Sequence, residues 1–148
     1  MIFEQEPLTR LVGLVTGIAW KIQRIAERAL RTHGLTYAQF GVLTAISEKD
    51  ARTQRELAER METDSNTVMV ICDSLEKKGL AARCQDPSDR RVRRISMTVR
   101  GGRVFTKALS AIQALYRPMS ESFADKEVLP LLPLLQRMYA YLKEREKT

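Results

Sequence analysis

The sequence predicts a mostly α-helical fold with one small β-hairpin, an α+β arrangement. Apolar residues recur at steps of three and four near both ends of the chain, which is the periodicity of amphipathic helices. Two capping boxes in the first half of the chain mark the starts of further helices. Between residues 80 and 98, two short segments alternate apolar and polar side chains around a turn-forming sequence, which predicts the hairpin.

The first predicted helix ends at Gly34, a typical helix-terminating residue. One face of this helix carries an apolar stripe of Leu11, Val15, Ile18, Ile22, Ile25 and Ala29. Thr36 and Gln39 form the first capping box, which opens a second helix. The side chains that this helix turns inward are Phe40, Leu43 and Ile46. A polar stretch over residues 47–52 ends it.

Thr53 and Glu56 form the second capping box and open a short helix. Its inward side chains are Leu57, Ala58 and Met61. Only residues 62–64 separate it from the next helix, for which Asp64 or Ser65 is a suitable N-cap. The apolar side of that helix consists of Val68, Ile71, Cys72 and Leu75, and Gly79 ends it. Two short helices across so tight a turn are expected to cross near a right angle, although this turn lacks the usual glycine.

The hairpin is predicted to start with a half-buried strand whose apolar side is formed by Leu80, Ala82 and Cys84. Asp86-Pro87-Ser88-Asp89 forms the turn, and Ile95 and Met97 face inward from the returning strand. Thr98 caps a helix that runs toward Pro118.

A last helix begins near Asp125 and carries the apolar residues Val128, Leu131, Leu132, Leu135, Met138 and Leu142. Pro130 and Pro133 both lie early in it. Because proline lacks an N–H group, Pro133 is expected to remove a backbone hydrogen bond or to kink the helix.

Composition excludes several classes of protein. With 44% hydrophobic and 29% charged residues, the 148-residue chain has the composition of one folded domain. The first residues lack a basic region followed by an apolar run, and no apolar run is long enough to span a membrane. We therefore expect no signal peptide, and a cytoplasmic protein with no membrane partner. Cys72 and Cys84 lie outside any CxxC spacing and are expected to be buried, reduced thiols. His33 is the only histidine, and no nucleotide-binding or nucleophile motif occurs, so we expect no metal, no cofactor and no enzyme activity.

The positive charge is concentrated in one segment. Residues 76–107 hold ten basic and three acidic residues, so this segment accounts for the whole net charge of +7. A neutral body with one basic segment favours a polyanionic partner. Charge alone leaves DNA, RNA and an anionic membrane surface open.

The helix pair followed by a basic hairpin favours DNA among these alternatives. The outward side of the helix that begins near Ser65 has short polar side chains, and a helix fits the major groove of B-DNA. Asp89-Arg90-Arg91-Val92-Arg93-Arg94 places four arginines in the hairpin without apparent acidic partners, and an arginine at a hairpin tip can enter a narrow minor groove. Asp89 is expected to pair with one of these arginines and aim it.

Five segments over residues 35–101 carry a recognisable set of motifs: Leu35-Thr36-Tyr37-Ala38-Gln39-Phe40, Gln54-Arg55-Glu56-Leu57-Ala58, Leu75-Glu76-Lys77-Lys78-Gly79-Leu80 followed by Arg83, Asp86-Pro87-Ser88-Asp89-Arg90-Arg91 and Met97-Thr98-Val99-Arg100-Gly101. In order and at the expected distances, they resemble the motifs of the MarR family of bacterial transcription regulators. The resemblance implies a winged helix-turn-helix lobe over residues 35–101 and a helical dimerisation region formed by residues 1–34 and 102–148. It also implies a homodimer that binds a pseudo-palindromic site. We expect a sequence-specific transcription regulator, a repressor in the first place, with an activator as the alternative.

The resemblance assigns roles to residues of this chain. The recognition helix would contact bases through Ser65, Asn66, Thr67, Met69 and Val70, and the wing would contact DNA through Asp89, Arg90, Arg91 and Arg93. Gln54 and Lys77 would contact the DNA backbone. Many members of the family have arginine where Val70 and Ser74 stand here, so a guanine contact cannot be carried over, and Val70 is left to contact a thymine methyl.

Two questions stay open at the level of sequence. Members of the family commonly bind aromatic anions between the dimerisation helices and the DNA-binding lobe, and a small-molecule effector would meet Trp20, Arg24 and Tyr37 here. Taken singly, Trp20 is expected in the core and Arg24 on the surface. The competing hypothesis is a winged-helix module that binds RNA or a protein partner. Because RNA-binding surfaces usually present aromatic residues and the basic segment contains only Phe105, duplex DNA is favoured.

Overall fold

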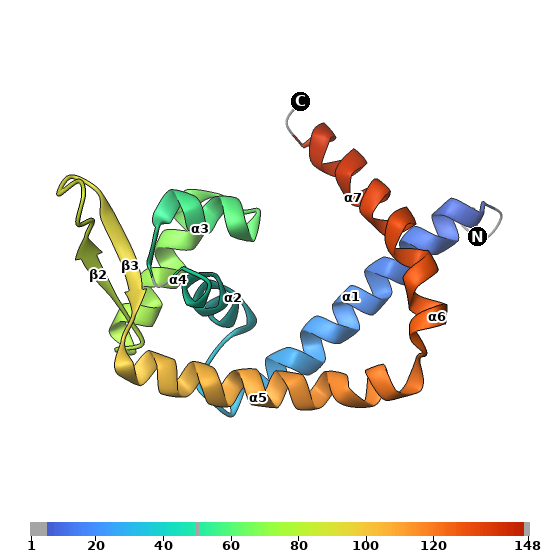
Figure 1. Ribbon diagram of the computed structural model, residues 1–148, viewed down its shortest axis with the longest axis horizontal. Helices are drawn as coiled ribbons and strands as arrows, with labels where there is room; N and C mark the ends of the chain where they lie inside the picture. The colour runs from blue at the N-terminus through green and yellow to red at the C-terminus, as the bar shows by residue number, and fades with distance from the viewer. Residues whose placement is uncertain (1–5, 50, 147–148) are drawn as a thin grey trace. The chain divides into compact units, whose positions relative to one another are not determined.

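The computed structural model describes residues 6–49 and 51–146, which form helices and one three-stranded antiparallel sheet (Figure 1). The elements are α1 (Pro7–Arg31), α2 (Tyr37–Ser47), β1 (Ala51–Thr53), α3 (Gln54–Met61), α4 (Ser65–Lys77), β2 (Ala81–Gln85), β3 (Arg93–Met97), α5 (Val99–Ser122), α6 (Asp125–Val128), the 3-10 helix η2 (Leu129–Leu131) and α7 (Leu132–Arg145). The chain forms two compact units, Met1–Ile112 and Gln113–Thr148. The predicted class, mostly helical with a small β component, is confirmed.

The first unit has its core between α2, α3 and α4. The largest fully buried side chains are Leu30, Leu35, Leu43, Ile46, Leu57, Leu75, Val42, Val68 and Cys72. Both predicted capping boxes are present: Thr36 Oγ1 accepts from the Gln39 amide at 3.1 Å, and Thr53 Oγ1 accepts from the Glu56 amide at 3.1 Å. Each box satisfies amides at a helix start that the helix itself cannot pair.

The apolar stripe of α1 is mostly uncovered. Only Ala26 and Leu30, near the carboxyl end of the helix, are buried. Val15, Ile18 and Ile25 of the predicted stripe are 39%, 51% and 50% exposed. The helix therefore forms as predicted, but most of its stripe is not covered by the other described residues of the first unit.

The turn between α3 and α4 forms without a glycine. Glu62 itself adopts the left-handed conformation, with φ of 52°. The Thr63 amide donates to Ala58 O at 3.0 Å, and Asp64 is the N-cap of α4, accepting from the Thr67 amide at 2.9 Å. The predicted three-residue turn is thus confirmed, with Asp64 rather than Ser65 as the cap.

Two strand predictions require correction. The stretch 47–52 was expected to be only a polar helix end, but residues 51–53 form β1, which pairs with β3 at Arg52↔Ile95. Arg52 is buried, with its Nε donating to Ala45 O at 2.5 Å and its Nη2 3.0 Å from Glu48 Oε2. A three-residue strand is too short to show alternation, and its buried arginine is satisfied by partners that composition does not reveal.

The inward side of β2 is the opposite of the predicted one. Ala81 is buried, whereas Ala82 and Cys84 are exposed. Leu80 is also buried, but it precedes the strand and follows Gly79, whose φ is +67°. The alternation therefore starts one residue later than Leu80 suggests. Cys84 is not a buried thiol, whereas Cys72 is buried, and burial raises its pKa to about 11.

The carboxyl-terminal helices differ from the prediction at their prolines. Thr98 precedes α5 and caps it, since its Oγ1 accepts from the Gly101 amide at 2.9 Å, and the helix continues past Pro118 to Ser122. The helix expected from Asp125 onward is interrupted by η2. Pro130 and Pro133 are the second residues of η2 and α7, where the missing N–H removes no intrahelical hydrogen bond. In place of the lost hydrogen bond or kink predicted at Pro133, η2 ends and α7 begins just before this residue.

Gly101 and Gly102 provide a matched test of the contact between α5 and the residue before β2. A Cβ at Gly101 would lie 1.9 Å from Leu80 O, whereas a Cβ at Gly102 would meet nothing nearer than Met97 Sδ at 3.9 Å. Gly101→Ala is expected to lower the free energy of unfolding by about 2 kcal/mol or more, because backbone must move. Gly102→Ala is expected to leave it unchanged or to raise it by about 0.5–1 kcal/mol. Urea unfolding measures both; equal stability of the two variants would contradict the close contact.

Candidate nucleic-acid interface

The outward face of α4 is fully accessible. Ser65, Asn66, Thr67, Met69 and Val70, the five residues predicted to contact bases, are all exposed. The Thr67 hydroxyl donates to Asp64 Oδ2 at 2.6 Å, so this residue also completes the helix cap. The structure therefore brings the predicted recognition residues together on the first two turns of one helix.

The two residues predicted to contact the DNA backbone lie at opposite ends of the helix pair. The Gln54 side chain donates from Nε2 to Ser65 O at 2.7 Å, which ties the start of α3 to the start of α4. Lys77 is exposed in the last turn of α4. The adjacent Lys78 donates to Gly34 O at 2.7 Å and to Gln39 Oε1 at 2.8 Å, so it holds the helices of the lobe together.

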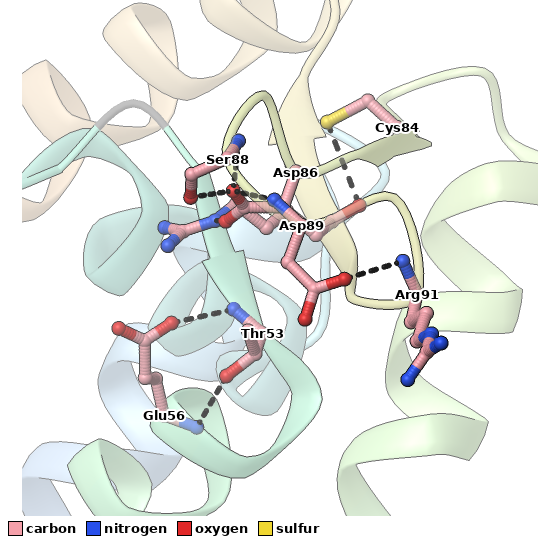
Figure 2. Close-up of polar contacts among 8 residues, drawn as sticks. Thr53, Glu56, Cys84, Asp86, Ser88, Asp89 and Arg91 are labelled. Carbon is pink, nitrogen blue, oxygen red and sulfur yellow. Dashed lines mark hydrogen bonds and ion pairs between the residues drawn. The ribbon is translucent and has the colours of Figure 1, made fainter.

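The connection between β2 and β3 is organised by the buried carboxylate of Asp86 (Figure 2). Its Oδ1 accepts from the Ser88 hydroxyl at 2.5 Å, the Ser88 amide at 2.7 Å and the Asp89 amide at 3.2 Å. Its Oδ2 accepts from Arg94 Nε. The Ser88 hydroxyl, and after it the Arg94 guanidinium, hold the pKa of Asp86 well below its usual range.

Asp89 shapes the turn through the main chain. Its Oδ1 accepts from the Arg91 amide at 2.9 Å, and its carbonyl oxygen accepts from the Val92 amide at 3.0 Å. Figure 2 shows the Arg91 side chain extending away from this carboxylate. The prediction that Asp89 aims an arginine by pairing with its side chain is therefore replaced by control of the backbone at Arg91.

The hairpin arginines fall into two groups, which corrects the prediction that none has an acidic partner. Arg94 pairs with Asp86. Arg90, Arg91 and Arg93 are exposed, and within the described residues no ion pair engages them. The predicted wing residues thus project from a loop that other contacts hold in shape.

Arg83 connects the wing to the recognition helix. Its Nη2 lies 2.5 Å from Asp73 Oδ1, its Nη1 pairs with Glu76, and its amide donates to Glu76 Oε1 at 2.9 Å. These contacts raise the pKa of Arg83, and the hydrogen bond to Asp73 contributes most. From the sequence Arg83 counted toward the basic charge and toward the motif that follows Leu80, but without a partner. Its position facing the two α4 acids depends on where β2 begins.

Trp20, Arg24 and Tyr37 line one groove of about 660 Å³ between α1 and the start of α2. Glu27, Arg28 and Arg31 are among its other lining residues. The Tyr37 amide donates to Glu27 Oε2 at 2.6 Å, which closes one end of the contact between the helices. Trp20 is 75% exposed, so the expectation that it belongs to the core is wrong.

Two helices across a three-residue turn, followed by an arginine-bearing hairpin, define a winged helix-turn-helix protein of the DNA-binding class. A model of the MarR family matches residues 33–92. An HTH-type transcriptional regulator of Bacillus subtilis, YsmB, is 30% identical over 128 residues, which are 86% of this chain and 88% of that protein. The chain belongs to the MarR family of transcription regulators.

Two solved structures extend the similarity. A mutant of MarR from E. coli, crystallised with operator DNA, is 27% identical to this chain and has a TM-score of 0.78. The aligned residues make up 93% of this chain and 97% of the MarR chain. CouR from Rhodococcus jostii, crystallised with p-coumaroyl-CoA, is 27% identical to this chain and has a TM-score of 0.81. The aligned residues make up 91% of this chain and 95% of the CouR chain. The predicted family and the predicted class, a DNA-binding transcription regulator, are confirmed, and the RNA or protein-binding alternative is not favoured.

Membrane-spanning helices and metal clusters are both absent from the described part of the chain. Within residues 6–49 and 51–146, no helix has both the length and the apolar character needed to cross a membrane. In the same ranges, no cluster of three or more His, Cys, Asp or Glu residues is arranged to hold a metal ion.

The Asp86 contacts give the wing a defined dependence on pH. Since the folded pKa of Asp86 is depressed, its stabilising effect is complete above the unfolded pKa of about 4 and is lost only as the pH falls through the folded value. In an Asp89→Asn background, which keeps an acceptor for the Arg91 amide and removes the second carboxyl of the turn, the amide resonance of Ser88 is therefore expected to stay constant from pH 7 to about pH 4 and to shift below it. Asp86→Asn in the same background should remove this transition. A transition centred at the usual aspartate value would contradict the assignment.

Proposed function

We propose that this chain is a homodimeric, sequence-specific transcription repressor that is released from DNA by a small aromatic anion. The observation that carries the DNA-binding part is the pairing of an exposed, uncharged recognition face on α4 with three exposed arginines on a wing whose backbone Asp86 fixes. In this proposal α4 enters the major groove and the wing arginines follow the adjacent minor groove, where the potential is most negative.

Arg91 is the proposed minor-groove residue, with Arg90 and Arg93 beside it. The Asp89 carboxylate supports this role because it fixes the main chain at Arg91 before DNA is bound. The entropic cost of ordering the loop is then not incurred on binding. Gln54 and Lys77 are proposed to contact phosphates on either side of the recognition helix. The binding of DNA by the MarR relative from E. coli supports this arrangement.

The dimerisation region is proposed to comprise residues 1–34 and 102–148, with the winged helix-turn-helix lobe over residues 35–101. Large apolar side chains are exposed in both terminal regions, which favours an intermolecular contact because monomeric proteins rarely leave so many uncovered. The most exposed are Leu8, Leu14, Ile18, Trp20, Phe123, Leu129, Leu131, Tyr139, Tyr141 and Leu142. A dimer would present two recognition helices to a pseudo-palindromic operator.

The groove beside Trp20 is the proposed effector site. An exposed indole supplies a stacking surface, and Arg24, Arg28 and Arg31 supply positive charge for an anion. The p-coumaroyl-CoA bound by CouR supports an aromatic acid or its thioester as the class of ligand. A regulator of this kind acts on the chromosome, so we place it in the cytoplasm, and we assign it no catalytic activity.

Selection of genomic fragments on the immobilised protein is expected to enrich specific duplexes, whose affinity falls steeply with salt because several phosphates are contacted. On an enriched duplex, Arg91→Ala is expected to weaken binding about tenfold. Its melting temperature should be unchanged because the side chain is exposed. Arg103→Ala is the matched control, as it removes the same charge from α5 and should have a much smaller effect. Equal affinity for random duplex would refute sequence specificity, and equal losses in the two variants would refute the role of the wing.

We expect a dimer because the apolar stripe on α1 is exposed. Light scattering after size-exclusion chromatography is expected to give twice 16.9 kDa. Ile18→Glu should shift the protein toward monomer, because it places a charge on the stripe. Thr16→Glu, on another side of the same helix, should remain dimeric. A monomer for the unmodified chain would contradict the proposal.

Trp20, the only tryptophan, is a reporter for its own groove. Titration with p-coumarate and with p-coumaroyl-CoA is expected to change the fluorescence of Trp20 saturably and to release the enriched duplex. Arg24→Ala should weaken this response about tenfold if the guanidinium pairs with the carboxylate or a phosphate. Arg10→Ala, elsewhere on α1, should not. Release of DNA without a change at Trp20 would place the effector elsewhere.

A further inference from the structure

The middle of the recognition face is apolar. Val70 is 65% exposed and Met69 is 40% exposed, and Asn66 lies one turn before Val70 on the same side of α4. Residues three and four apart are neighbours on a helix, so these three side chains form one continuous patch. Since the Val70 side chain is largely uncovered, it contributes little to the core of the lobe.

Charge surrounds this patch without entering it. No charged residue occurs between Ser65 and Cys72. One turn further on, Asp73 is neutralised by Arg83, whose Nη2 is 2.5 Å from its Oδ1. Exposed cations lie at the end of α4, with Lys77, and on the wing. Attraction to phosphates therefore acts at the edges of the recognition face. The centre of that face has one side-chain amide, of Asn66, and the methyl groups of Met69 and Val70.

The edges of the four base pairs in the major groove differ in what they require. Guanine presents two acceptors that suit a cation, cytosine a donor that suits a carboxylate, adenine a pattern that suits an amide, and thymine a methyl that suits an apolar side chain. The patch has no cation, and the carboxylates of α4 on either side of it are engaged: Asp64 by the amide and hydroxyl of Thr67, and Asp73 by Arg83. Its chemistry therefore matches A·T base pairs.

We propose that Val70 determines specificity by packing against the 5-methyl group of a thymine in each half-site, with Asn66 bonded to an adjacent adenine. This inference rests on the proposed function, since it requires α4 to enter the major groove. It goes further by naming the bases that the groove must present and the group on each base that is recognised.

Removal of the thymine methyl alone tests the contact. A random duplex library is taken through selection on the full-length protein, and the enriched duplex is then synthesised with thymidine or with deoxyuridine. The unmodified protein is expected to bind the deoxyuridine duplex about tenfold more weakly, the loss expected for one buried methyl in each of two half-sites. Val70→Ala should bind the thymidine duplex with a similar loss and should no longer distinguish the two duplexes.

Two further variants secure the interpretation. Val70→Thr keeps one methyl and should retain part of the discrimination. Val99→Ala, which truncates another largely exposed valine at the start of α5, should retain all of it. Circular dichroism should show each variant folded. Equal binding of both duplexes by the unmodified protein, or full discrimination by Val70→Ala, overturns the contact while leaving DNA binding intact. Failure to enrich any duplex overturns the proposed function as well.

Discussion

The Asp86 carboxylate is buried at the base of the wing and accepts hydrogen bonds from Ser88, from the Asp89 amide and from Arg94. A buried anion is stable only when its acceptors are filled, and here they are filled by the main chain of the turn and by an arginine of the returning strand. The same contacts that compensate the charge also fix the loop. The exposed arginines beyond it are thereby held on an ordered support in spite of their mutual repulsion.

A second constraint joins this support to the recognition helix. Arg83 extends from β2 to Asp73 and Glu76 of α4, and Gln54 ties the first turn of α3 to Ser65. Gly101 allows α5 to approach Leu80 closely enough that no larger residue fits. These contacts lie within the first unit and fix the distance between a helix suited to one groove and a hairpin suited to the next. The relative positions of α4 and the hairpin thus depend on a few polar contacts and one glycine more than on the apolar core.

The sequence was sufficient for the parts of the fold that have strong local signals. The two capping boxes, Gly79 and the Asp86–Asp89 turn each act on neighbouring backbone, so they placed α2, α3 and the hairpin correctly. It was insufficient where the signal is long-range. β1 exists because Arg52 pairs with β3 and finds acceptors on α2, and Arg83 finds its partners only when β2 starts at Ala81. The role of Asp89 was misjudged because side-chain pairing and backbone capping share the same spacing.

The exposure of Asn66, Met69 and Val70 has an evolutionary consequence. Largely exposed side chains can be exchanged at little cost in folding free energy, because surface substitutions usually change stability by less than about 0.5 kcal/mol. The buried Asp86 carboxylate and the contacts that fill its acceptors, in contrast, tolerate little change. If α4 reads the major groove as proposed, a duplicated copy of this protein would acquire a new set of target promoters through two or three substitutions on one helix face, and the wing arginines would keep its general affinity for DNA.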